Sequence, residues 1–196
     1  MPFTSWRFAT FFLLLSPGVW LVYGFIANNL GANPVETLTH QTGKWAFICL
    51  LVSLAITPAR QLTGVKKLML LRRMVGLYAF FYATLHFLVY WVFDQSLSVA
   101  YLWEDISDRP YITLGFLGWL LLLPLAITST QNWRKRLGKR WLTLHKLTYA
   151  VGLLALFHYI WLIRADYSEV VPYATILVAL LGYRVFRWLK TTQSAA

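Results

Sequence analysis

The sequence predicts an all-α, polytopic membrane protein with six transmembrane helices, and two observations carry this prediction. The chain of 196 residues is 59% hydrophobic, has a mean hydropathy of +0.57 and contains only 13% charged residues, which is outside the range of soluble domains. Apolar runs long enough to cross a bilayer alternate with short polar loops. No low-complexity segment or Gly- or Ser-rich linker divides the chain, so residues 1–196 are expected to form a single domain.

The first three helices are expected at about 7–28, 42–58 and 73–93. Pro17 and Gly18 interrupt the first helix, and a neighbouring helix must compensate for the backbone hydrogen bond that the proline removes. This run is expected to be a membrane span and not a cleavable signal peptide, because it is long enough to span and shows no small-residue cleavage site. Lys44 adjoins the short uncharged run of the second helix and is expected to extend its amino group to the interface.

The remaining three helices are expected at about 110–128, 141–163 and 172–189. Pro110 suits a first helical turn, where its missing N–H would be unsatisfied in any residue. An acidic loop precedes the fourth helix, and the basic stretch NWRKRLGKR precedes the fifth. Six spans place both termini on the same side of the membrane.

The distribution of charge predicts the orientation. The chain carries 18 Lys and Arg against 7 Asp and Glu, a net charge of +11. On the predicted topology 15 of the 18 basic residues fall on the side of the termini, and all seven acids fall on the other side. The positive-inside rule therefore places both termini in the cytoplasm. Because the basic residues punctuate apolar segments and form no basic domain, no nucleic-acid partner is expected, and the lipid bilayer is the expected surrounding.

Two histidines of the fifth helix suggest a cofactor site. His145 and His158 are thirteen residues apart, or about 20 Å along a helix axis, close to the two faces of a bilayer core. On the third helix, His86 reaches nearly the depth of His158. Two imidazoles from facing helices can hold a six-coordinate haem b, although a single histidine in an apolar helix can also be hydrogen-bonded in a core. Ionisable groups at this depth are costly and usually functional, which favours the haem interpretation.

His145 has no histidine at its own depth. Counting back from His86 by the same distance reaches Arg72 and Arg73, which could neutralise haem propionates, lie on the open axial side of an inner haem, or serve only as topology charges. Thirteen residues of an ideal helix also leave His145 and His158 roughly 140° apart in azimuth. A bend, a local change in winding, or two haems held at different angles is needed to reconcile this difference.

The other polar features indicate less. His40 is expected in the outer loop before the second helix, as a cap or an interface contact with a propionate, a quinone or a docking partner. The single cysteine, Cys49, excludes an internal disulfide and a cysteine-ligated cluster within one chain. No phosphate-binding loop, zinc-protease motif or catalytic triad is recognisable. Most tryptophans fall near predicted interfaces, which favours membrane anchoring over a redox relay.

Six strings of the sequence together carry a family likeness: GANPVETLTHQTGKWAF, ITPAR, RRMVGLYAFFYATLHFLVY, RPYITLG, ITSTQ and LGKRWLTLHKLTYA. They resemble the MsrQ family, formerly called YedZ, over about residues 20 to 190. This family supplies the haem-binding membrane subunit of a bacterial periplasmic methionine sulfoxide reductase system. Its fold is similar to the six-helix ferric reductase and NADPH oxidase transmembrane domain. Those relatives place two histidines on each of two helices, whereas this chain has only His86 on the third, with Arg72 at the place of the missing partner.

The resemblance implies an electron-transfer subunit in the bacterial inner membrane. Electrons from the quinone pool or a cytosolic flavin reductase would cross by one or two haem b groups to the periplasmic molybdopterin subunit MsrP, which repairs methionine sulfoxide in oxidised proteins. The family is also described as binding FMN, although no residue here independently indicates a flavin site. Two alternatives stay open: a stand-alone transmembrane ferric or metalloreductase, and a non-redox transporter or membrane-assembly protein. The absence of acidic residues from the predicted spans argues against the transporter.

Overall fold

The protein is a bundle of long apolar helices. A computed structural model describes residues 5–163 and 166–193, and these residues form helices and turns without strands. Five helical segments are long and apolar enough to cross a membrane. Their main helices are α1 (Ser5–Ile26), α2 (Pro34–Thr63), α3 (Met69–Val89), α5 (Pro110–Ile127) and α9 (Val171–Gln193). The predicted all-α, multi-pass membrane fold is therefore confirmed.

The remaining span is divided. Where one helix over 141–163 was expected, the structure has α7 (Lys139–Leu144) and α8 (Leu147–Leu162), separated by a turn at His145 and Lys146. The 16 residues of α8 are fewer than the 18 of α5, the shortest of the five long spans. Shorter helices complete the fold: η1 (Lys66–Leu68), η2 (Tyr90–Asp94, a π turn), α4 (Val99–Asp108), α6 (Gln131–Leu137) and η3 (Tyr167–Glu169).

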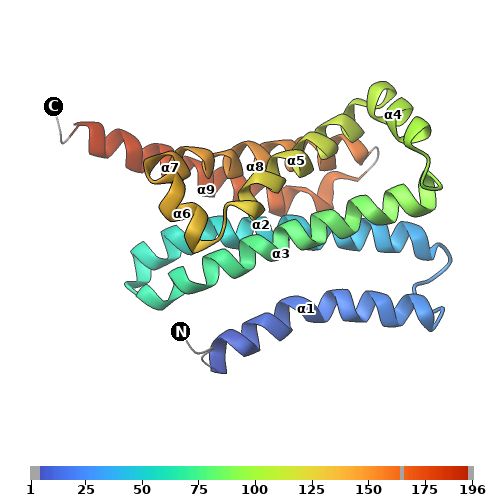
Figure 1. The fold of residues 1–196 in the computed structure, drawn as a ribbon, viewed down its shortest axis with the longest axis horizontal. Helices are drawn as coiled ribbons and strands as arrows, with labels where there is room; N and C mark the ends of the chain where they lie inside the picture. Colours follow the sequence, from blue (N-terminus) through green and yellow to red (C-terminus); the bar gives the residue numbers. More distant parts are fainter. Residues whose placement is uncertain (1–4, 164–165, 194–196) are drawn as a thin grey trace.

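The helices pack in two principal pairs, α2 with α3 and α5 with α8, and the elongated bundle has two unlike ends. Both termini, the α2–α3 connection, α6 and α7 lie at one end of Figure 1, which we call the basic end. The α1–α2 connection and α4 lie at the opposite end, which we call the acidic end. The acidic end holds all seven carboxylate side chains: Glu36, Asp94, Glu104, Asp105, Asp108, Asp166 and Glu169.

α2 is longer than the predicted 42–58 at both ends. The Asn33 side chain caps its N-terminus by accepting a hydrogen bond from the Glu36 N–H, and Pro34 occupies the first turn. Gly64 ends the helix in the left-handed region, with φ of 72°. His40 therefore lies within α2 and not in a preceding loop, which corrects the sequence-based placement.

α1 lies at the edge of the bundle (Figure 1) and is tied to α3 at its proline. The Tyr82 hydroxyl donates to the Leu14 carbonyl at 2.6 Å and accepts from the Gly18 N–H at 3.0 Å. It thus inserts between a donor and an acceptor that a regular helix would join directly. The carbonyl that lacks its donor because of Pro17 is that of Leu13, and it accepts from the Ser16 hydroxyl of α1 itself at 2.9 Å. The neighbouring helix α3 therefore compensates the adjacent Leu14–Gly18 pair, whereas the bond that Pro17 removes is replaced within α1.

The proline inside α2, Pro58, is compensated by a neighbouring helix. Pro58 has no N–H to donate to the Leu54 carbonyl, and this carbonyl accepts a hydrogen bond of 2.8 Å from the Arg184 guanidinium of α9. Arg184 also donates to the Tyr149 hydroxyl at 3.0 Å and lies over that ring. The guanidinium therefore joins α9 to α2 and α8.

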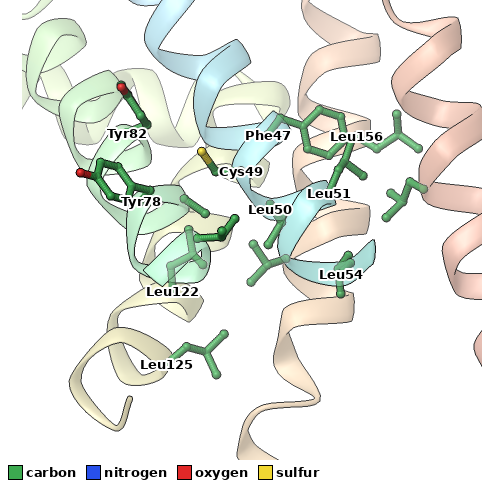
Figure 2. Packing of buried hydrophobic residues seen from close by; sticks show 14 of the residues in the cluster. Phe47, Cys49, Leu50, Leu51, Leu54, Tyr78, Tyr82, Leu122, Leu125 and Leu156 are labelled. Carbon is green, nitrogen blue, oxygen red and sulfur yellow. The ribbon is translucent and has the colours of Figure 1, made fainter. Parts of the chain in front are cut away.

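The side chains of the buried core come mainly from α2, α3, α5, α8 and α9. Figure 2 shows Cys49 of α2 directed towards Tyr78 and Tyr82 of α3. Cys49 and Tyr82 are both 0% exposed, so the thiol is a packing group. Large apolar side chains such as Phe12, Leu13 and Tyr23 are exposed on the outer face of α1, as expected for contact with lipid.

Candidate functional site

His86 of α3 and His158 of α8 face each other towards the acidic end. Their ring centres are 6.0 Å apart and the ring planes are nearly perpendicular, at 79°. Two imidazole nitrogens that bind one metal ion at about 2 Å each place their ring centres roughly 6 Å apart. The structure therefore brings the predicted pair together at the spacing that one shared iron requires.

Each imidazole is held from behind by a backbone carbonyl. His86 Nδ1 lies 2.8 Å from the Thr39 oxygen, and His158 Nδ1 lies 2.6 Å from the Tyr111 oxygen. A carbonyl can only accept, so Nδ1 carries the proton in both rings and Nε2 keeps its lone pair. This tautomer and this outer-shell hydrogen bond are typical of histidines that bind a metal through Nε2.

Two glycines allow this close approach. A β-carbon at Gly43 would lie 3.1 Å from His86 Nδ1, and one at Gly115 would lie 2.8 Å from His158 Nδ1. Gly43 follows Thr39 by one helical turn, and Gly115 follows Tyr111 by one turn. Each histidine therefore packs against one turn of a neighbouring helix. This turn supplies a carbonyl that accepts from Nδ1 and a glycine that leaves room for the ring.

The two halves of the site are related by a constant offset of 72 residues, from Thr39 to Tyr111, from Gly43 to Gly115 and from His86 to His158. Several other residues that line the space between the histidines obey the same offset: Phe47 and Trp119, Leu50 and Leu122, Ala79 and Val151, and Ala83 and Ala155. The α2–α3 pair and the α5–α8 pair thus form an internal structural repeat around the site.

A cavity of about 1350 Å³ contains both histidines. Typical small-molecule pockets are about 300–1,000 Å³, so the space suits a large ligand. Its lining includes several small residues: Gly43, Ala79, Ala83, Gly115, Gly118 and Ala155. Within the described residues no three His, Cys, Asp or Glu side chains are grouped to hold a bare metal ion. A macrocycle that brings its own four nitrogen ligands, as haem does, would need only this pair of histidines and a cavity of this size.

Asp105 of α4 closes one side of the cavity mouth. Its Oδ2 accepts from the Tyr90 hydroxyl at 2.6 Å and from Gln95 Nε2 at 2.7 Å, and its Oδ1 lies 3.3 Å from Arg109 Nε. Tyr90 lies one turn beyond His86, whereas Arg109 immediately precedes α5. The Asp105 carboxylate therefore bridges the two halves of the repeat.

Glu169 forms a similar bridge on the other side. It pairs with Lys44 of α2 at 2.7 Å and accepts from the Tyr159 hydroxyl of α8 at 3.3 Å. Lys44 immediately follows Gly43, and Tyr159 immediately follows His158. Each bridge thus joins a tyrosine next to one histidine to a base of the other half of the repeat. Asp105 joins Tyr90 to Arg109, and Glu169 joins Tyr159 to Lys44.

His145 lies at the basic end in a different setting. Its Nε2 is 3.1 Å from the Thr128 hydroxyl, and its ring stacks on Trp141 with centres 4.0 Å apart. In an ideal helix His145 and His158 would point in directions about 140° apart, so a local change in winding was one of the expected solutions. The turn between α7 and α8 is such a change. Through it, His145 reaches the C-terminus of α5 while His158 reaches the N-terminal turns of the same helix.

The two arginines near His145 differ. The 72-residue offset makes Arg73 the counterpart of His145, but Arg73 is exposed. Arg72 is partly buried and lies within electrostatic range of His145, Tyr149 and Arg184. Of the two candidates, the structure therefore brings Arg72 and not Arg73 towards His145.

His40 is exposed on α2 and lines the cavity mouth one turn before Lys44. Sequence reasoning did not identify Gly43, Gly115, Lys44 or Arg109 as site residues. For the two bases a signal existed, because they are exceptions to the partition of charge between the two sides. The two glycines carry no such signal until the helices that they contact are known.

Comparisons with known proteins agree with this architecture. Residues 42–156 match the family described as "Ferric reductase like transmembrane component". The chain is 50% identical over 183 residues to a protein of Xanthomonas axonopodis pv. citri (strain 306) named "Protein-methionine-sulfoxide reductase heme-binding subunit MsrQ", covering 93% of this chain and 84% of that protein. A Bordetella pertussis protein of the same name is 47% identical over 170 residues, covering 86% of this chain and 82% of its own length. No solved structure matches the chain.

The match over residues 42–156 contains the whole of α3, including His86, and reaches into α8 just short of His158. The class of protein is thus a ferric reductase-like transmembrane component. The chain belongs, within that class, to the MsrQ family.

Proposed function

We propose that this chain binds haem b between His86 and His158 and acts as the membrane electron-transfer subunit of a methionine sulfoxide reductase system. The observation that carries the proposal is the separation of 6.0 Å between the two imidazoles, each with Nδ1 held by a carbonyl. Bound haem would supply one-electron chemistry, and His86 and His158 are the residues that would hold it. Thr39 and Tyr111 orient the two imidazoles through their carbonyls.

The partners follow from the names of the relatives. Those proteins are named haem-binding subunits of a methionine sulfoxide reductase, which implies a separate catalytic subunit, and we assign this role to periplasmic MsrP. The quinone pool or a cytosolic flavin reductase is the proposed electron donor. The excess of basic residues at the end that holds both termini supports an inner-membrane orientation with the termini in the cytoplasm. Electrons would then leave near the acidic end.

A second haem is proposed at the basic end, with His145 as its ligand and Arg72 beside it. In the present structure His145 Nε2 is engaged by Thr128, so binding there requires this hydrogen bond to break. FMN is proposed as a further cofactor on the family likeness alone, with no residue assigned to it.

A stand-alone metalloreductase is the second candidate function, favoured by the family description "Ferric reductase like transmembrane component". The two functions make different predictions for the purified chain. A metalloreductase reduces ferric chelates without a soluble subunit. An electron-transfer subunit reduces methionine sulfoxide only when its catalytic partner is added.

The test of the haem site is a pyridine haemochrome assay together with visible and electron paramagnetic resonance spectra of purified protein. The wild-type chain should contain haem b with a low-spin, two-imidazole signature. His86→Ala and His158→Ala should each remove this signature, because either change leaves one axial position empty. A low-spin spectrum unchanged in both variants would exclude the assigned pair.

A further inference from the structure

We infer that Lys44 and Arg109 form a two-point binding site for the two propionate groups of the haem at the mouth of the cavity, an inference that rests on the proposed function. Among the described residues they are the only lysine or arginine side chains at the acidic end, which otherwise carries carboxylates. Both line the cavity that contains His86 and His158. Haem b carries two carboxylates, so the number of bases matches the number of anionic groups.

The two bases lie on opposite sides of the histidine pair. Lys44 follows Gly43, whose backbone packs directly on the His86 ring. Arg109 lies two residues before Tyr111, whose carbonyl holds the His158 ring. Each base is thus attached to the helical turn that supports one ligand. A group bound between the rings has one base on either side.

Both bases keep donors for a further anion. The Lys44 ammonium has three donors, and its ion pair with Glu169 uses one of them at 2.7 Å. The Arg109 guanidinium has five donors, and its contact with Asp105 is made through Nε at 3.3 Å. The Glu169 side chain is 59% exposed and can turn to solvent at little cost when another carboxylate takes its place.

The negative charge around the cavity mouth makes Lys44 and Arg109 important for binding an anionic group. Five carboxylates line the cavity: Glu36, Asp94, Glu104, Asp105 and Glu169. The same lining contains the bases Lys44 and Arg109 and the imidazole of His40. An anionic ligand edge placed among these carboxylates is repelled unless each anionic group meets a cation, because charges that are partly buried are screened weakly.

A purely structural role for the bases makes a different prediction. Lys44 and Arg109 also complete the Glu169 and Asp105 bridges between the halves of the repeat. If only the bridges matter, removing a base weakens the binding of every form of haem equally. If the bases bind propionates, removing a base weakens the binding only of haem that has free propionates.

The experiment compares haem b with haem dimethyl ester, in which both propionates are neutral. Apoprotein in detergent is titrated with each haem, and affinity is followed by the low-spin absorbance. The variants are Lys44→Gln and Arg109→Gln, with Lys66→Gln as the control because Lys66 is an exposed base at the opposite end. Loss of a hydrogen-bonded ion pair costs about 1.5–3 kcal/mol, so each test variant should bind haem b more than about tenfold more weakly.

For the dimethyl ester the same variants should stay within about twofold of wild type, which isolates the interaction by a double-mutant cycle. Equal weakening for both haems, or none for either, would overturn the inference. Wild-type protein that binds neither haem with a two-imidazole spectrum would instead refute the proposed function.

A redox measurement gives an independent readout that unfolding cannot imitate. Lys44→Gln removes a positive charge near the haem and should lower its midpoint potential, whereas Glu169→Gln removes a competing carboxylate and should raise it. Shifts of the same sign in both variants would contradict the assignment. Lys44→Arg and Arg109→Lys keep the charge and should retain haem b affinity.

Discussion

Gly115 lies against the imidazole of His158 so closely that a β-carbon at residue 115 would be 2.8 Å from Nδ1. That nitrogen is already fixed by the Tyr111 carbonyl at 2.6 Å, so the ring cannot move away without losing its hydrogen bond. On the other half of the repeat, Gly43 stands in the same relation to His86, at 3.1 Å. The position of each imidazole therefore depends on the absence of a side chain at the glycine beside it.

Gly115→Ala should displace His158 and remove the low-spin haem signature. The strain of such overpacking is about 1–3 kcal/mol. Gly43→Ala should have a smaller effect because its distance is larger. The matched control is Gly118→Ala, whose nearest contact would be Leu154 Cβ at an ordinary 3.8 Å. Spectra of the three variants check this ordering, and a normal Gly115→Ala spectrum would contradict it.

His145→Ala should leave the low-spin signature of the His86 and His158 pair unchanged, because His145 contacts Thr128 and Trp141 at the other end of α5. Any haem bound at the basic end should be lost. Haem stoichiometry by pyridine haemochrome separates the two sites. Loss of the low-spin signal itself would show that the two ends depend on each other, contrary to this expectation.

Tyr82→Phe should destabilise the attachment of α1. The change leaves the Gly18 N–H and the Leu14 carbonyl without their shared partner, at a cost of about 1–3 kcal/mol. Tyr78→Phe removes a single hydrogen bond to the Phe11 carbonyl and should cost less. Thermal unfolding in detergent gives the comparison. Equal stability of the two variants would show that the double hydrogen bond of Tyr82 has no special role.

Arg184→Met should destabilise the protein because the Leu54 carbonyl loses the donor that replaces the N–H that Pro58 lacks. The cost expected for an unpaired carbonyl is about 1–3 kcal/mol. Pro58→Ala restores a backbone donor, so Arg184→Met should cost less in that background. Unfolding measurements on the two single variants and the double variant form the cycle, and strict additivity would exclude the proposed compensation.

Much of the fold follows from local sequence properties. Apolar runs and proline positions predict the helices, and Pro110 begins α5 as expected. The division at His145 does not follow, since no proline or glycine marks it. The Asn33-Pro34 pair is a recognisable signal for the start of α2. The polar residues that follow it, however, have the composition of a loop.

The candidate site could be predicted from the sequence to a similar extent as the fold. His86 and His158 could be paired because position along a helix converts directly into depth in a membrane. The supporting carbonyls of Thr39 and Tyr111 could not be foreseen, because they depend on which helices pack together and at what rotation. The same reason hides the choice between Arg72 and Arg73, which differ by one residue and hence by about 100° around α3.

The two halves of the repeat agree at the acidic end and diverge at the basic end. Near the acidic end each half contributes one imidazole, one carbonyl and one glycine. Near the basic end the counterpart of His145 is Arg73, and the two residues lie in unlike surroundings. On the proposed function, a cofactor at the acidic end is therefore held by two equivalent half-sites, whereas one at the basic end would meet two different residues.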